Sequence, residues 1–201
     1  MVIVTLERAV PGFDRSITIG GLPGTGTTTA CRLVREQTGL HYVYAGQMFR
    51  DMARQQGMSL EQFGRYCEEH PEVDRRLDDE QIELLKGPPI LQEGRMSGVL
   101  AARNNIPAYK VWFTCDPWVR AERIVNREGG DAEDRMAEMR RREESEKKRY
   151  LAFYNYDTGD LSAYDLVLDT SQIPAEEVVR RVLDGYNAPP VAPKKWYQFW
   201  R

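Results

Sequence analysis

The sequence has few of the residues that enzymes commonly use for metal centres or nucleophilic attack. Only two of its 201 residues are histidines, His41 and His70, and neither has the spaced partners of a Ser/His/Asp array. The three cysteines, Cys31, Cys67 and Cys115, are an odd number without metal-ligand spacing, and two of them lie in apolar periodic segments typical of a core. These features exclude a hydrolase triad and a cysteine metal site, and they suit a reducing cytoplasm.

Long apolar runs and a surplus of basic charge are also missing. No window reaches the length of a membrane span, and the first residues, MVIVTLERAVPGFDRS, have no basic leader or small-residue cleavage site. The formal net charge is −3, which argues against a surface built for nucleic acid or anionic lipid. We therefore expect a cytoplasmic protein with no nucleic-acid or membrane partner.

Strand-like and helix-like segments alternate along the chain. Short β-branched or aromatic runs end in Gly, Asp or Ser and predict strands at 16–21, 41–46, 89–94, 109–116 and 165–171. Helical patterns lie at 27–37, 47–56, as a polar pair across 59–86, and at 117–127, 131–154 and 175–183. This alternation, with 41% apolar residues, predicts an α/β protein with one core and a doubly wound parallel sheet.

Chemically informative residues follow three of the predicted strands. In parallel sheets, ligands bind beyond the carboxyl ends of the strands. The first strand runs into GGLPGTGTTTA (20–30), the second leads to Arg50, and the third ends in Glu93 and Arg95. The sequence thus predicts that a glycine-rich loop, an acid and two arginines share one crevice.

The glycine-rich stretch has the spacing of a phosphate-binding loop, G-x-x-x-x-G-K-[ST], but Thr27 takes the place of the lysine. Its backbone N–H groups can bind phosphate at a helix start. Thr28 could then bind Mg²⁺, with Glu93 holding the ion through water. The alternative is a plain turn in which a threonine caps the helix. Without the lysine, a charged hydrogen bond of about 1.5–3 kcal/mol needs another source, or activity falls.

A basic segment, RRREESEKKRY, occupies residues 140–150. On a helix, Arg142, Glu146 and Arg149 lie at i, i+4 and i+7 and share one stripe. One interpretation is a solvated face of alternating charge. The segment falls between the last two strands, however, where a lid would lie above the phosphate loop and its arginines would stabilise a transferring phosphoryl group.

Six ordered blocks resemble one known family: ITIGGLPGTGTTT, YAGQMFRDMARQQGMSLEQF, EVDRRLD, EGRMSG, VRAERIVNREG and RREESEKKRYLAFYNYDTGDLSAYDLVLDTS. From about Ser16 to Val182 the chain is similar to the archaeal type of cytidylate kinase, one of the P-loop nucleoside monophosphate kinases. The resemblance implies reversible transfer of the γ-phosphoryl of ATP to CMP or dCMP, with Mg²⁺, on a five-stranded sheet of order 2-3-1-4-5.

The resemblance also implies how the chain is organised. A single kinase domain would have its core at about 16–186, a helical monophosphate-binding insertion at 47–87 and a lid at 128–156. The chain departs from the family in two segments that this core does not need. The N-terminal extension, 1–15, could add an edge strand, and the aromatic tail, 187–201, would pack on the body, lie disordered or bind a partner. We expect a monomer whose partners are the small-molecule substrates CMP or dCMP and ATP.

The family's functional residues map onto matching positions of this chain. Arg50 and Arg95 would grip the phosphate of the monophosphate, and Arg142 and Arg149 would span both phosphates, with Glu146 orienting them. Asp74, Arg75 and Asp78 would face the cytosine, with no base contact assigned among them. The ATP loop would comprise Gly21, Leu22, Pro23, Gly24, Thr25, Gly26, Thr27, Thr28 and Thr29.

The threonine at the lysine position leaves three interpretations. The first is an active kinase in which lid closure brings Arg142 or Arg149 into part of the space of the missing lysine. The second is a kinase for another monophosphate, UMP or AMP, since base choice depends on a few hydrogen bonds. The third is a nucleotide-binding regulatory protein that has lost catalysis.

Overall fold

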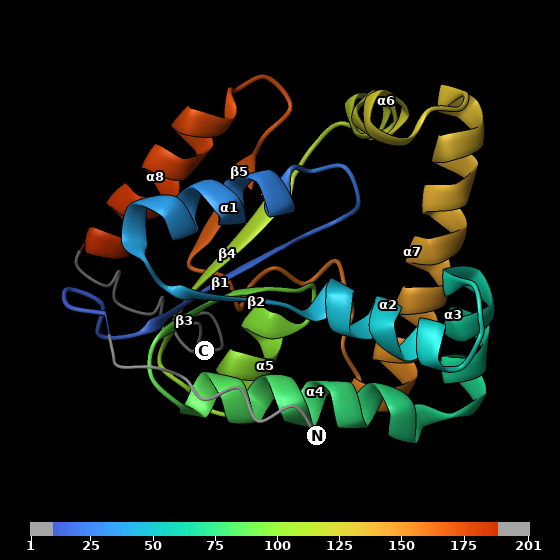
Figure 1. The fold of residues 1–201 in the computed structure, drawn as a ribbon, viewed down its shortest axis with the longest axis horizontal. Coiled ribbons are helices and arrows are strands. Elements are labelled where there is room, and N and C mark those ends of the chain that lie inside the picture. Colours follow the sequence, from blue (N-terminus) through green and yellow to red (C-terminus); the bar gives the residue numbers. More distant parts are fainter. Residues whose placement is uncertain (1–9, 189–201) are drawn as a thin grey trace, which may run out of the picture.

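The computed structural model describes residues 10–188, in which strands alternate with helices from residue 16 onward (Figure 1). The strands are β1 (Ser16–Gly21), β2 (His41–Tyr44), β3 (Ile90–Glu93), β4 (Ala108–Thr114) and β5 (Leu166–Asp169). The helices are α1 (Thr27–Thr38), α2 (Ala45–Gln55), α3 (Leu60–Glu69), α4 (Pro71–Lys86), α5 (Ser97–Arg103), α6 (Pro117–Glu128), α7 (Ala132–Tyr154) and α8 (Ala175–Asn187). All the strands pair in parallel in the order β2-β3-β1-β4-β5, which confirms the predicted sheet.

Two predictions about the elements were wrong in detail. Residues 45–46, expected to finish the second strand, instead begin α2, so the strand ends at Tyr44. The short helix α5 was not predicted, because residues 97–101 are all buried and leave no polar face from which a helical period could be read.

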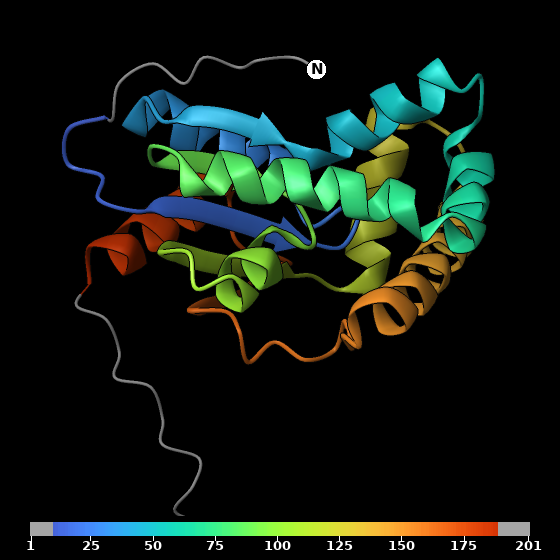
Figure 2. The same ribbon diagram turned by 90° about the horizontal axis from the view of Figure 1, so that it is seen from below.

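The sheet is covered on both faces. Helices α1 and α8 lie over one face, and α4 and α5 lie over the other (Figures 1 and 2). Burial on both sides explains why β1 reads as a nearly continuous buried run. The largest core cluster lies on the α1 and α8 side and includes Ile17, Ile19, Val34, Val111 and Phe113.

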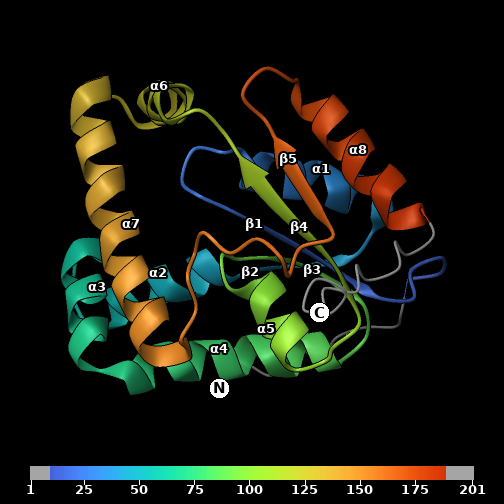
Figure 3. The same cartoon turned by 180° about the vertical axis from the view of Figure 1, so that it is seen from behind.

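Helices α2, α3, α6 and α7 gather beyond the carboxyl ends of the strands (Figures 1 and 3). The long helix α7 packs against α6 at one end and against α3 farther along. Helix α7 falls within the range expected for a lid, and α2 to α4 make up most of the range expected for the insertion. The fold thus encloses the edge of the sheet where the sequence predicts a ligand.

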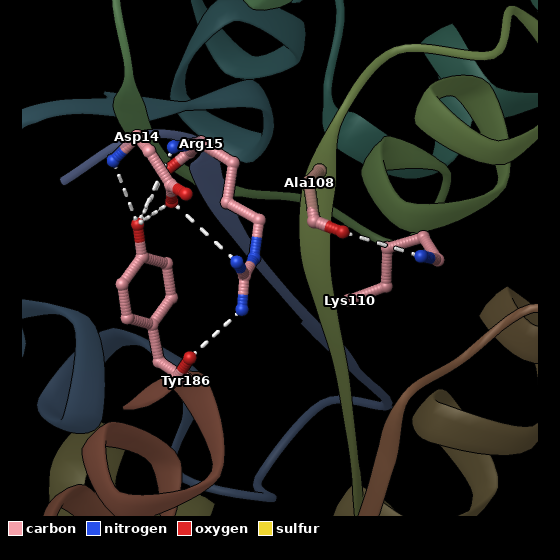
Figure 4. Close-up of polar contacts among 5 residues, drawn as sticks. All are labelled: Asp14, Arg15, Ala108, Lys110 and Tyr186. Atoms are coloured by element: carbon pink, nitrogen blue, oxygen red, sulfur yellow. Dashed lines mark hydrogen bonds and ion pairs between the residues drawn. The ribbon is translucent and has the colours of Figure 1, made fainter. Parts of the chain in front are cut away.

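The chain enters β1 from a segment that is tied to the last helix (Figure 4). The Tyr186 hydroxyl of α8 accepts hydrogen bonds from the backbone N–H groups of Asp14 (3.1 Å) and Arg15 (3.3 Å), and it donates to the Asp14 carboxylate at 2.9 Å. The Arg15 guanidinium donates to the Tyr186 carbonyl at 2.8 Å. Residues 10–15 form no strand, and the rest of the predicted extension and the aromatic stretch of the tail lie outside the described residues.

Two further sequence expectations concern the cysteines and the membrane. Cys31 and Cys67 are buried, as expected for two core cysteines, and Cys115 is half-buried. Within residues 10–188, no helix combines the length and the apolar character needed to cross a bilayer.

Candidate active site

A cleft of about 850 Å³ lies at the carboxyl edge of the sheet, between the β1–α1 loop, the helices α2 to α4 and the helix α7. It brings together most of the residues singled out from the sequence. Those that line it are Gly21, Leu22, Pro23, Gly24, Thr27, Thr28, Arg50, Asp74, Asp78, Glu93, Arg95, Arg142, Glu146 and Arg149.

Four predicted site residues do not line the cleft. Arg75 is exposed, because α4 turns residues 74, 77, 78 and 81 inward and leaves 75 and 76 on its outer face. Gly26 and Thr29 are exposed, and Thr25 is buried with its hydroxyl on the Leu22 carbonyl at 2.8 Å. A role for these loop residues would have to come from their backbone.

The glycine-rich loop has the conformation that phosphate binding requires. Gly24 and Gly26 have φ of 84° and 88°, which few other residues adopt. A Cβ on Gly24 would also lie 2.6 Å from the Arg120 carbonyl oxygen. Helix α1 starts after Gly26 without a side-chain cap, so the capping alternative does not describe this loop. The first N–H groups of α1 therefore remain available to an anion.

Within residues 10–188, Glu93 is held by hydroxyl groups and by no cation. The hydroxyls of Thr27 and Thr28 both donate to its Oε1 at 2.8 Å, and the Tyr42 hydroxyl donates to its Oε2. Burial, together with the neighbouring carboxylate, raises the pKa of Tyr42 and keeps it protonated as a donor. Glu93 is 4% exposed and makes no ion pair within residues 10–188. The residue at the lysine position thus orients the acid without neutralising it.

These oxygen atoms suit a magnesium ion. Mg²⁺ prefers hard oxygen ligands and usually binds through one or two carboxylates, substrate phosphates and waters. The Thr28 hydroxyl and the Glu93 carboxylate share a contact at the edge of the phosphate loop. The described residues contain no cluster of three or more His, Cys, Asp or Glu that could hold a metal by itself. The chain therefore fits an ion that is held jointly with a bound nucleotide.

Two arginines of the cleft are already paired with carboxylates. The Arg149 Nη1 lies 2.7 Å from both oxygens of Asp74, and both side chains are buried. Arg95 is paired with Glu146. Burial lowers the pKa of Arg95 to about 10, so its guanidinium is charged at neutral pH but poorly solvated. An anionic ligand would restore the stabilisation that this charge has lost.

The pairing differs from the expectation for the lid. Glu146 was expected to orient Arg142 and Arg149 on its own helix, but its carboxylate binds Arg95 across the cleft. Arg149 likewise finds its partner on α4 rather than at the phosphate loop. The tertiary structure explains both pairs, because it brings Glu146 close to Arg95 and Arg149 close to Asp74. In this structure, the Arg149 guanidinium is therefore bound by Asp74.

Arginines of α6 were missed by the sequence reasoning. Arg120 contacts the Pro23 carbonyl at 3.3 Å and Glu143 at 2.7 Å. Arg123 contacts the Gly24 carbonyl at 3.4 Å, and Arg127 lines the cleft. The block VRAERIVNREG carried the signal, because three arginines spaced at i, i+3 and i+7 share one face of a helix.

Comparisons with known proteins identify the family of the chain. A family model described as an AAA domain matches residues 17–150. A cytidylate kinase of Methanocaldococcus jannaschii is 47% identical over 163 residues, which cover 81% of this chain and 92% of the relative. One of Pyrococcus abyssi is 44% identical over 162 residues, covering 81% and 88%.

Solved structures share the fold at much lower identity. A gluconokinase from Sinorhizobium meliloti has a TM-score of 0.59 at 18% identity, with 89% of this chain and 93% of that chain covered. A shikimate kinase from Bacteroides thetaiotaomicron has a TM-score of 0.51 at 14% identity, with 85% and 96% covered. The fold is that of small P-loop kinases, and with relatives at 44–47% identity over most of its length, the chain belongs to the cytidylate kinase family.

Proposed function

We propose that the protein transfers the γ-phosphoryl group of ATP reversibly to CMP, giving ADP and CDP. The observation that carries the proposal is one cleft in which an uncapped phosphate loop faces four arginines, Arg50, Arg95, Arg142 and Arg149, in a chain closely related to proteins named cytidylate kinase. This arrangement provides anion-binding groups for both a donor and an acceptor phosphate.

In this proposal, the donor nucleotide binds at the glycine-rich loop. The backbone N–H groups that open α1 hold its phosphates, and the positive φ values of Gly24 and Gly26 point them toward the anion. Thr28 and Glu93 would hold Mg²⁺ together with those phosphates. When bound, the ion neutralises charge that develops on the transferring group.

The acceptor occupies the other half of the cleft. Arg50 of α2 and Arg95 bind its phosphate, and the helices α2 to α4 act as the monophosphate-binding insertion. Arg95 exchanges Glu146 for the phosphate, so binding replaces one anionic partner with another. Helix α7 acts as the lid, whose Arg142 and Arg149 reach both phosphates and supply charge in place of the missing lysine.

The reaction needs no nucleophilic side chain or general base. The attacking atom is a phosphate oxygen that is largely ionised at neutral pH, so the residues must align two anions and offset their repulsion. The lid and the insertion together exclude water, which would otherwise hydrolyse ATP. This explains why a site so poor in histidine and reactive cysteine suffices.

One coupled assay separates the candidate functions. Purified protein with ATP and Mg²⁺ is given CMP, dCMP, UMP, AMP or GMP in turn, and formation of ADP is followed. We expect the highest kcat/KM with CMP and dCMP. Higher kcat/KM with UMP or AMP would identify a different acceptor, and no turnover with any nucleotide would support the regulatory alternative. The monomeric state and the cytoplasmic location stay predictions.

A further inference from the structure

A chain of buried polar side chains runs from the sheet to the cleft. Gln92 of β3 donates from Nε2 to the Gln81 Oε1 and to the Ser97 Oγ, each at 3.1 Å. The Ser97 hydroxyl donates to the same Gln81 oxygen at 3.0 Å. Gln81 Nε2 then donates to Asp78 Oδ1 at 2.9 Å. Gln81 and Asp78 are 2% and 6% exposed, and both line the cleft.

These hydrogen bonds fix the orientation of the Gln81 amide. Gln81 Oε1 already accepts two hydrogen bonds, so its amide cannot turn over without losing both. Its Nε2 must therefore face Asp78, which makes Oδ1 an acceptor whatever the ionisation of the carboxyl group. Only the second oxygen, Oδ2, is left to meet a ligand.

Asp78 Oδ2 has no hydrogen-bond partner among residues 10–188. The Tyr154 hydroxyl faces the carboxyl group but makes no hydrogen bond of normal geometry. Asp78 is 6% exposed and lines the cleft, so a ligand that donates a hydrogen bond to Oδ2 would satisfy an oxygen that the described residues leave without a donor. A phosphate does not suit this position, because it would repel the ionised acid and the cleft provides arginines for phosphates. Asp78 must then face the uncharged part of the acceptor.

We propose that Asp78 selects the base of the acceptor, with Oδ2 accepting a hydrogen bond from the exocyclic amine of cytosine, and that Gln81 is the positioning residue that orients the carboxyl group. The inference rests on the proposed function. Uracil carries a carbonyl oxygen in place of this amine, so two acceptors would meet and one buried group would stay unpaired. The contact separates CMP from UMP; adenine also carries an amine, so it does not separate CMP from AMP.

The ionisation of Asp78 gives the proposal a pH dependence. Burial raises the pKa of Asp78 to about 7, with help from Asp74 and Asp79 on α4, and Arg149 and Tyr154 on α7 oppose the shift. Since Gln81 holds Oδ1, the proton lies on Oδ2 in the neutral acid. The neutral acid therefore presents a donor, which suits the uracil carbonyl, and the ionised acid presents an acceptor, which suits the cytosine amine.

The test compares kcat/KM for CMP, dCMP and UMP in the wild type, Asp78→Asn and the control Glu80→Gln. Glu80 lies on the exposed face of α4, outside the cleft. In Asp78→Asn, Gln81 would hold the amide oxygen and direct the amide nitrogen at the base. The ratio of CMP to UMP should fall by about 100-fold or more, because a donor now faces the amine. The ratio of CMP to dCMP should not change, and Glu80→Gln should match the wild type.

The wild-type pH profile tests the same idea if Asp78→Asn does not fold. The CMP to UMP ratio of kcat/KM should rise as the pH increases through about 7, and the phosphate ionisation common to both nucleotides cancels from it. An unchanged ratio in a folded Asp78→Asn, a flat wild-type profile, or an altered CMP to dCMP ratio, which would indicate a sugar contact, each overturns the inference. If the wild type makes CDP, the proposed function survives that result. If it makes none, both fail.

Discussion

Arg149 of α7 places a single nitrogen, Nη1, 2.7 Å from both carboxylate oxygens of Asp74 on α4. Both side chains are at least nine-tenths buried. The pair joins the proposed lid to the proposed insertion, 75 residues away in sequence, and it occupies a guanidinium that the proposed reaction needs. Arg149 therefore contributes both to the stability of the free protein and, in the proposed reaction, to substrate binding.

We predict that Asp74→Asn destabilises the protein by about 3 kcal/mol, because it leaves the Arg149 charge buried without a counter-charge. Urea unfolding followed by circular dichroism measures the change. The matched control is Glu61→Gln, which breaks the exposed i,i+4 pair with Arg65 on α3 and should cost about 0.5 kcal/mol or less. Equal losses of stability in the two variants would contradict a stabilising role for the buried pair of Arg149 and Asp74.

The pairing of Arg95 with Glu146 predicts the behaviour of a second variant. In Glu146→Gln, the acceptor phosphate no longer has to displace a carboxylate, so the KM for CMP should fall by about 3- to 10-fold. Initial rates at saturating ATP measure it. Glu133→Gln, an exposed change in the first turn of α7, is the control and should leave KM unaltered. A raised KM would mean that Glu146 orients arginines for the phosphate, as the sequence suggested.

The sequence predicted the sheet and the edge that carries the site, because both depend on local patterns. β-branched runs mark buried parallel strands, and glycines at fixed spacing mark a backbone that reaches positive φ, as Gly24 and Gly26 do. Helix α5 was not predicted, because its residues 97–101 are all buried and show no polar face. Local sequence patterns thus predict which helices and strands form and which ends of the strands carry the site.

The partners of the charged residues could not be predicted in the same way. Helical spacing correctly placed Arg142, Glu146 and Arg149 on one stripe, but Glu146 and Arg149 bind residues of other elements. Those contacts depend on how closely α4 and α7 approach, which no spacing along one helix contains. For the same reason, the sequence does not predict that Gln81 forms hydrogen bonds with both Gln92 and Asp78.

The shared contact of Thr27 and Thr28 with Glu93 predicts a difference between the two threonines. We expect Thr28→Val to raise the Mg²⁺ concentration for half-maximal rate by at least about 10-fold, since it removes the hydroxyl that would bind the ion. Thr27→Val removes one of three hydroxyl donors to Glu93 and should raise it about threefold or less. Both variants keep the shape of the residue, so each serves as the other's control in a magnesium titration. A larger effect at Thr27 would move the metal ligand to that position.

Asp78 should make the stability of the free protein depend on pH in an unusual direction. Its folded pKa, about 7, lies above the unfolded value of 3.8, so the folded state binds the extra proton between these values. By linkage, stability from this group is fully present below about pH 4 and is lost as the pH rises toward 7. Asp78→Asn removes the titration while keeping the shape of the side chain. The variant should therefore gain stability over the wild type as pH rises, by up to about 4 kcal/mol at pH 8.

Unfolding free energies of the wild type and Asp78→Asn, measured in urea at intervals between about pH 4 and pH 8 without nucleotide, check this prediction. The comparison cancels the other titrating groups, such as Glu177, whose pKa is lowered to about 2 by its hydrogen bonds to Arg180 and Arg181. Glu80→Gln, an exposed change on the same helix, is the control and should keep the pH dependence of the wild type. If the gap between the wild type and Asp78→Asn stays constant with pH, Asp78 is ionised throughout, and the carboxylate must then be stabilised by a donor such as the Tyr154 hydroxyl.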